Sequence, residues 1–214
     1  GTVDVSEVIP ASGTTIKFYA VSTTTGEPEP ETVGYTVNYY YDSVLNADKT
    51  ETGSGKVGDE ITSVTDKSGE GYCLDHDNLP FTLTDTEANN IITVYYATDR
   101  NDNDTPDYKE EKYSLTYNTN GGVGSVEGGN SYITGDTVNL NDGSGLGAEN
   151  DGIVFVGWTV GPNAYTADNA ATSEPTGVEI VDKVTFRTES ITVYAVWAAD
   201  KNNNDKPDYE EEEP

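Results

Sequence analysis

Hydrophobic and polar residues alternate along several short stretches of the chain, and the hydrophobic ones are mostly β-branched or aromatic. The clearest stretches are 35–41, 91–97, 113–117 and 191–197. A period of two residues is typical of a half-buried β-strand. No ten-residue segment has a clear period of 3.6, so only short helical turns are expected, near 84–89 and 164–171. The pattern predicts a mainly β fold, α+β at most, with little helix.

The predicted strands recur in the same order, which indicates two tandem modules. Gly-Asp pairs occupy equivalent places at 58–59 and 135–136, and the acidic run at 99–108 returns at 200–209, each time behind a β-type stretch. Internal repetition of this kind is typical of an array of small domains. We expect an N-terminal strand with a Pro/Glu linker (1–33), a β module (34–98), an acidic junction (99–112), a second β module (113–199) and a second acidic junction (200–214).

Charge and composition limit the partners and the covalent links. A formal net charge of −28 on 214 residues disfavours nucleic acid and anionic membrane, since binding to either requires Lys and Arg to neutralise phosphate. We expect no nucleic-acid partner, whereas an acidic surface suits divalent cations. Cys73 is the single cysteine, which excludes an internal disulfide. We expect no membrane span, because no apolar run approaches roughly 18–20 residues. The lack of a signal peptide and of an initiator Met predicts a fragment of a longer protein. We also expect the chain to be a monomer.

Three segments of the second module, 113–122, 154–158 and 191–197, occur in the order seen in a known family. Through them, residues 113–199 resemble the Listeria–Bacteroides repeat, also called the internalin-type B-repeat. The chain departs from that pattern by a Gly/Asn-rich loop at 139–151 and a long Ala/Thr/Asp stretch.

The first module resembles a different family. Residues 34–98 are similar to MucBP-like modules through the segments 35–39, 55–59 and 93–96. Both resemblances imply tandem β-grasp-like folds in extracellular, cell-wall-attached stalk or adhesion proteins of bacteria. Neither resemblance implies catalysis.

The repeated acidic loop has the spacing of a calcium site. Counted from Asp99 and from Asp200 as position 1, oxygen donors recur at positions 1, 3, 5, 7, 9 and 12, which is the ligand spacing of an EF-hand loop. The candidate ligands are Asp99, Asn101, Asn103, Thr105, Asp107 and Glu110 in the first loop, and Asp200, Asn202, Asn204, Lys206, Asp208 and Glu211 in the second, with position 7 acting through its backbone carbonyl.

The loops depart from an EF-hand in ways that predict a weak site. Position 6 is Asp instead of Gly, position 8 is Pro, and no helices flank either loop. The loops therefore look more like the calcium segments of dockerin or thrombospondin type-3 repeats. We predict a calcium affinity on the order of 10⁻⁴–10⁻³ M, with the ion stiffening the junction. The alternative is a solvated acidic linker.

The sequence offers little for catalysis. Cys73 and His76 form the only Cys/His neighbourhood, and residues three apart on a strand point to opposite faces. Trp158 and Trp197 lie in β-branched stretches and are expected in the core. We therefore predict a non-enzymatic stalk or adhesion spacer on a bacterial surface. The alternatives are a binder of a host glycan or protein through Tyr-rich faces or the 139–151 loop, and an accessory domain of a secreted hydrolase.

Overall fold

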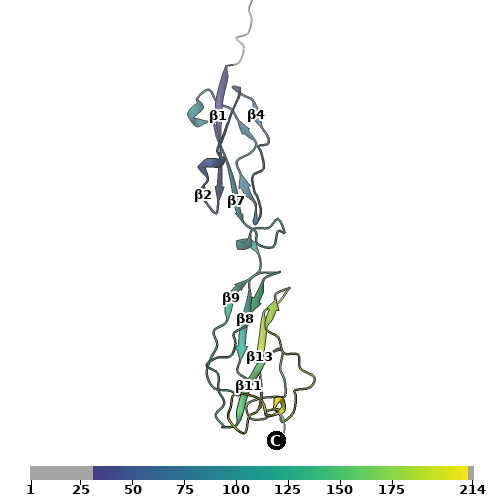
Figure 1. Ribbon diagram of the computed structural model, residues 1–214. Coiled ribbons are helices and arrows are strands. Elements are labelled where there is room, and N and C mark those ends of the chain that lie inside the picture. Colours follow the sequence, from purple (N-terminus) through teal and green to yellow (C-terminus); the bar gives the residue numbers. More distant parts are fainter. Residues whose placement is uncertain (1–30, 212–214) are drawn as a thin grey trace, which may run out of the picture.

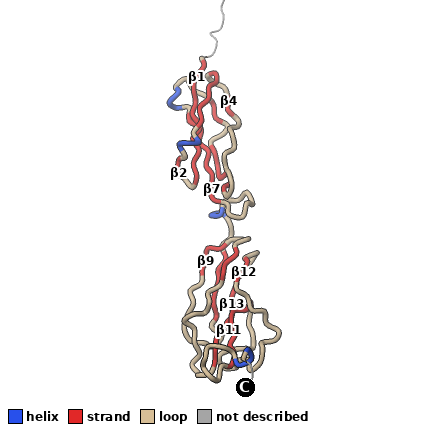
Figure 2. The backbone as a smooth tube through the Cα atoms, viewed as in Figure 1, coloured by secondary structure: helices blue, strands red, loops and turns tan. Residues whose placement is uncertain are grey.

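The computed structural model describes residues 31–211, and the predicted strand and linker before residue 31 lie outside this range. The chain forms two β modules arranged end to end, with the acidic loop 99–112 between them (Figure 1). Strands form the centre of each module, and long loops run along its sides (Figure 2). The described residues contain no α-helix, so the prediction of a mainly β fold in two modules is confirmed.

The strands of the first module precede the acidic loop. They are β1 (Thr32–Tyr41), β2 (Val44–Leu45), β3 (Glu51–Lys56), β4 (Glu60–Ile61), β5 (Tyr72–Asp77), β6 (Phe81–Thr82) and β7 (Ile91–Thr98), with the 3₁₀ turns η1 (Ala47–Lys49) and η2 (Glu87–Asn89). The turn η2 lies where a short helical turn was expected at 84–89.

The strands of the second module follow the acidic loop. They are β8 (Tyr113–Asn118), β9 (Gly129–Tyr132), β10 (Thr137–Asn139), β11 (Ile153–Val160), β12 (Lys183–Thr185) and β13 (Ile191–Ala199), with the 3₁₀ turns η3 (Asp107–Lys109) and η4 (Asp208–Glu210) in the two acidic loops. The segment 164–171, where a helical turn was also expected, forms turns and bends instead.

Both modules place their first and last strands side by side. In the first module β1 is parallel to β7, with β3 antiparallel to β1 and β5 antiparallel to β7. In the second module β8 is parallel to β13, with β9 and β11 antiparallel on the two outer sides. This central parallel pair directs the end of β7 and of β13 into an acidic loop at the same end of each module.

The two cores use different aromatic residues. The first module buries Tyr39 and Tyr96, and their hydroxyls donate to the Thr65 carbonyl at 2.9 Å and to the Asp66 carboxylate at 2.9 Å. Burial raises the pKa of Tyr96 to about 12. The second module instead buries Trp158 and Trp197, which are 2% and 1% exposed, so their predicted place in the core is confirmed. Each ring offers the large apolar area that a small β module needs.

The Gly-Asp pairs form the same turn in both modules. Gly58 has φ +91° and Gly135 has φ +94°, the left-handed conformation that glycine adopts readily. The carboxylate one residue later, Asp59 or Asp136, accepts a backbone N–H three residues back at 2.8 and 2.9 Å. Each turn also makes two backbone hydrogen bonds with one later residue, Leu83 or Phe186. The sequence equivalence of the two pairs is therefore a structural one.

Candidate functional site

Each acidic loop begins with a buried aspartate at the end of a core strand. Asp99 follows β7 and is 2% exposed, and Asp200 follows β13 and is 4% exposed. The two oxygens of Asp99 accept the N–H groups of Asn103 at 3.1 Å and Asp104 at 2.8 Å. In the second loop, Asp200 accepts the N–H groups of Asn204 at 3.1 Å and Asp205 at 2.9 Å. Position 1 therefore folds the loop around its own carboxylate.

The backbone of both loops has left-handed residues at positions 4 and 6. Asp104 and Asp205 at position 6 have φ +61° and +65°, and Asp102 and Asn203 at position 4 have φ +51° and +54°. Asp and Asn tolerate this conformation better than most residues other than Gly. The replacement of Gly at position 6 therefore leaves the tight turn in place.

Position 9 holds the loop instead of facing its centre. Asp107 accepts the backbone N–H of Arg100 at 2.9 Å, and Asp208 accepts that of Lys201 at 2.9 Å. Asp107 also pairs with the Arg100 guanidinium. The prolines at position 8 are buried and directly precede η3 and η4. Their missing N–H costs no bond, because a 3₁₀ turn leaves its first donors unpaired anyway.

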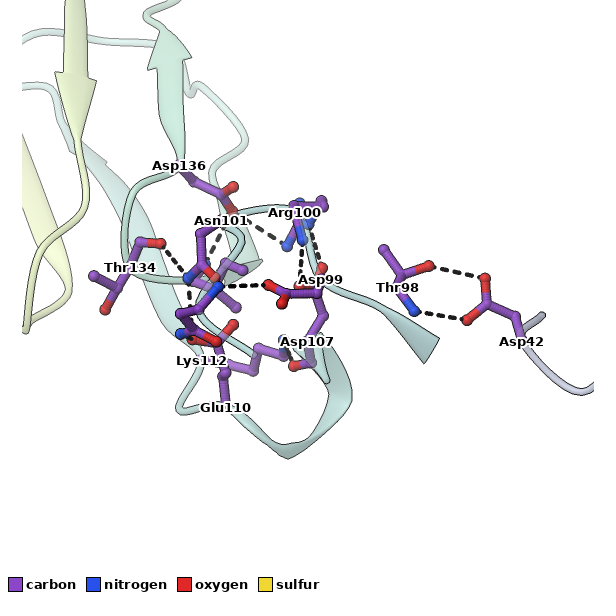
Figure 3. Close-up of polar contacts among 12 residues, drawn as sticks. Asp42, Thr98, Asp99, Arg100, Asn101, Asp107, Glu110, Lys112, Thr134 and Asp136 are labelled. Atoms are coloured by element: carbon purple, nitrogen blue, oxygen red, sulfur yellow. Dashed lines mark hydrogen bonds and ion pairs between the residues drawn. The ribbon is translucent and has the colours of Figure 1, made fainter. Parts of the chain in front are cut away.

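Side chains at positions 3, 5 and 12 come together in both loops. In the first, one oxygen of Glu110 accepts the carboxamide N–H of Asn101 at 3.1 Å (Figure 3). The same oxygen accepts the carboxamide N–H of Asn103 at 2.8 Å. In the second, Glu211 accepts those of Asn202 and Asn204. The predicted ligands at these positions are therefore neighbours, and the carboxamides present nitrogen to the carboxylate where a cation would need oxygen.

The donor set fits a weak cation site. Asn101 Oδ1 and Glu110 Oε2 are buried oxygens without a hydrogen-bond partner, and such atoms call for an explanation such as a bound ion. Rotation of the Asn101 and Asn103 carboxamides would replace nitrogen with oxygen beside Glu110. Nowhere in 31–211 do three Asp, Glu, His or Cys side chains form a metal-holding group. Ion binding would therefore depend on carboxamide and carbonyl oxygens.

The residues at position 7 contribute a backbone contact. The N–H groups of Thr105 and Lys206 donate to the carboxamide oxygens of Asn103 at 2.8 Å and Asn204 at 3.0 Å. These short-range bonds orient the asparagine at position 5 in each loop.

The first loop also contacts both modules. Toward the second module, Asn101 donates to the Thr134 carbonyl at 2.9 Å, and Arg100 Nη2 lies 3.3 Å from an Asp136 carboxylate oxygen (Figure 3). Thr134 and Asp136 belong to the Gly-Asp turn of the second module. The loop therefore attaches itself to the module that follows it.

Toward the first module, the loop binds a carboxylate that the sequence did not single out. Lys109 Nζ lies 2.5 Å from Asp75 Oδ1, and the Tyr108 hydroxyl donates to the same oxygen at 2.6 Å. These donors, Lys109 foremost, hold the pKa of the Asp75 carboxyl well below its usual range. Asp75 lies on β5, and nothing in its local sequence indicates a role, because its partners come from a different segment.

The Cys/His neighbourhood lacks the features of a nucleophile. Cys73 is buried, and burial together with the nearby Asp99 carboxylate raises the pKa of its thiol, which disfavours the reactive thiolate. His76 stacks on Tyr95 with 4.3 Å between ring centres, and its Nδ1 lies 2.9 Å from Asp75. Each side chain has its own structural partner.

The described residues contain no helix long and apolar enough to cross a membrane. In comparisons with known proteins, no family model matches the chain, and no curated protein matches it.

Proposed function

We propose that this chain is a non-catalytic repeat region of a bacterial cell-surface protein, where it serves as an extracellular stalk or adhesion spacer with calcium-stiffened junctions. The end-to-end arrangement of two β modules supports this proposal, since it separates the two ends of the described residues (Figure 1). The resemblance of the two modules to the Listeria–Bacteroides repeat and to MucBP-like modules points to the same role.

The observation that carries the proposal is the acidic loop between the modules. Its side chains contact both modules, through Asp75 on one side and through Thr134 and Asp136 on the other. A spacer transmits force and keeps its length only where its joints resist bending. These contacts support a joint that is ordered and not a free linker.

Calcium would be held by the carboxylate of position 1, the carboxamides of positions 3 and 5, the carbonyl of position 7 and the carboxylate of position 12. When bound, the ion would supply positive charge and cross-link these oxygens. Position 9 would act differently from its predicted role, because Asp107 and Asp208 hold backbone N–H groups in their loops. With so few carboxylates per site, the affinity would be on the order of 10⁻⁴–10⁻³ M.

Calorimetric titration of the chain with Ca²⁺ tests this proposal. We expect two weak sites, and 10 mM Ca²⁺ stabilises each occupied loop by about 1.4 kcal/mol for a Kd of about 1 mM. Glu110→Gln removes the first site and Glu211→Gln removes the second. The matched control is Glu111→Gln, which makes the same charge change at an exposed neighbour and retains both sites. Absence of Ca²⁺ binding at 10 mM contradicts the calcium part and leaves the spacer role standing.

A second candidate function is recognition of a host glycan or protein. On one face of the first module, Tyr40, Tyr95 and His76 form a three-ring stack across β1, β7 and β5, with ring centres 4.6 and 4.3 Å apart. A hollow of about 310 Å³ lies beside it, lined in part by Asp42 and Tyr108. NMR titration with mucin-type oligosaccharides tests this function, because His76 is 61% exposed and its ring signals report binding. Unchanged His76 signals at millimolar sugar exclude it.

A further inference from the structure

The first acidic loop recognises a specific surface of the second module, its Gly-Asp turn (residues 133–136). Two groups of the turn are bound: the carbonyl of Thr134 by Asn101, at 2.9 Å, and the carboxylate of Asp136 by Arg100, at 3.3 Å. The turn is rigid, because the N–H of Ile133 also donates to the Asp136 carboxylate at 2.9 Å. The pair of contacts therefore needs a carbonyl and a carboxylate held two residues apart.

The turn is a recurring element and not a peculiarity of the second module. Residues 56–59 of the first module repeat its φ angle at glycine and its backbone bonds. The carboxylate of Asp59 is exposed there, whereas Asp136, under Arg100, is half-buried. The lower exposure of Asp136 is consistent with its contact with Arg100, for which Asp59 has no counterpart among the contacts described above.

The second acidic loop presents a cation and a carboxamide at the positions of the two donors of the first loop. Lys201 stands in the place of Arg100 and Asn202 in the place of Asn101, and the carboxylates inside the loop make the same bonds. Both donors are exposed, and the Lys201 side chain is 81% exposed. Asn101, whose carboxamide reaches the Thr134 carbonyl, is half-buried. The second loop thus has the donors of a joint without the contacts that they make in the first.

We propose that the second loop, residues 200–211, is a docking surface for a further β module that carries a Gly-Asp turn. Lys201 binds the aspartate carboxylate of that turn, and Asn202 binds the backbone carbonyl two residues before it. The occupant is a module like that of residues 113–199. In the first joint, Arg100 and Asn101 bind the Gly-Asp turn of that module, and Lys201 and Asn202 occupy the matching positions in the second loop. Lys201 supplies the local positive charge for the turn carboxylate, within a loop that is otherwise acidic.

The inference deepens the proposed spacer role and rests on it, but it does not depend on calcium. The first loop binds the turn through protein groups alone. Docking at the second loop is therefore expected in EDTA, where no cation competes for the Asn202 carboxamide. A chain that docks in EDTA and ignores Ca²⁺ overturns the calcium part of the proposed function while supporting the docking surface.

The test extends the full chain with a second copy of residues 113–199, fused after Glu213. This position retains the two residues that separate position 12 from the first strand in the first joint. Spin labels on exposed strand positions on either side of each joint give inter-module distance distributions by pulsed EPR. We expect the distribution across the second joint to be as narrow as that across the first, in EDTA.

Paired variants make the test specific. Lys201→Ala with Asn202→Ala should broaden the distribution at least twofold across the second joint only, and Arg100→Ala with Asn101→Ala across the first only. Lys183→Ala, at an exposed lysine on β12 outside both loops, is the control and should change neither. A broad distribution across the second joint, or one that the Lys201 and Asn202 substitutions leave unchanged, overturns the proposal.

Discussion

The two acidic loops make nearly the same internal hydrogen bonds but differ in their contacts with the rest of the chain. Asp99 and Asp200 accept the same backbone N–H groups, and Glu110 and Glu211 accept the same pairs of carboxamides. The first loop contacts both modules. The second contacts the module that it follows, where the Gly152 N–H donates to Asn203 at 2.9 Å. The local sequence therefore encodes the loop, and its neighbours decide whether the loop becomes a joint.

Two residues of the first loop that reach outward, Arg100 and Lys109, are replaced in the second loop. Arg100 pairs with Asp107 in its own loop and with Asp136 in the second module, which a planar guanidinium with several donors does well. Its counterpart Lys201 pairs with Asp208 alone among the described residues. Lys109 forms an ion pair with Asp75. The second loop has Glu210 at the equivalent position, and a glutamate cannot form an ion pair with a carboxylate.

The largest expected effect comes from removing the buried carboxylate. Asp99→Ala and Asp200→Ala each leave two backbone N–H groups without their partner, and hydrogen bonds to charged groups contribute about 1.5–3 kcal/mol. We expect each loop to lose roughly 2–3 kcal/mol of local stability. Amide hydrogen exchange at positions 5 and 6 should then accelerate by about 30- to 140-fold, at 1.4 kcal/mol per factor of ten.

The same pair of variants separates the two loops. Asp99→Ala should also broaden the inter-module distance distribution, whereas Asp200→Ala should leave the two modules as they are. Glu111→Ala, at an exposed carboxylate of the first junction, is the control for lost charge. Equal effects of the two Asp variants on inter-module order would show that the loops play the same part in this chain.

Acid should loosen the first joint through Asp75. Its depressed pKa means that the bridge to Lys109 and Tyr108 contributes fully above the ordinary carboxyl pKa of about 3.9. That contribution is lost as the pH falls through the lower, folded-state pKa. Lys109→Ala should raise the Asp75 pKa toward about 3.9, which carboxyl NMR titration measures. The comparison variant Glu210→Ala should leave Asp75 unchanged, and an ordinary Asp75 pKa in the unaltered chain would refute the bridge.

The smallest expected effect concerns the shape of the cation. Arg100→Lys retains the charge but offers one compact donor group where Arg100 reaches both Asp107 and Asp136. We expect the inter-module coupling to weaken by a few tenths of a kcal/mol, since exposed ion pairs contribute about 0.2–1 kcal/mol. The reverse change, Lys201→Arg, should leave inter-module order unaltered. Distance distributions of both variants at low and high salt check this, and an Arg100→Lys joint as narrow as the original would exclude the two-partner role.

Residue spacing predicts much of the structure of the acidic loop. What it fails to predict also has a physical reason. The convergence of positions 3, 5 and 12 follows from a chain that winds around one carboxylate, so spacing alone predicts it. The use of Asp107 to hold the Arg100 N–H was not predicted, because one carboxylate can serve an ion or a backbone donor equally well. Binding of calcium stays a prediction.

The sequence by itself determined the main strands, the two modules, the tryptophan core of the second module and the convergence of positions 3, 5 and 12 in both acidic loops. These features depend on alternation, side-chain size and contacts between residues a few positions apart. Only the tertiary structure decided that Asp75 and the turn at Asp136 meet the first loop, because β5 and that turn reach the loop through strand pairing across each module. Pairing between distant segments leaves no mark at the residues it brings together, which is why the repeated loop was evident in the sequence and the joint was not.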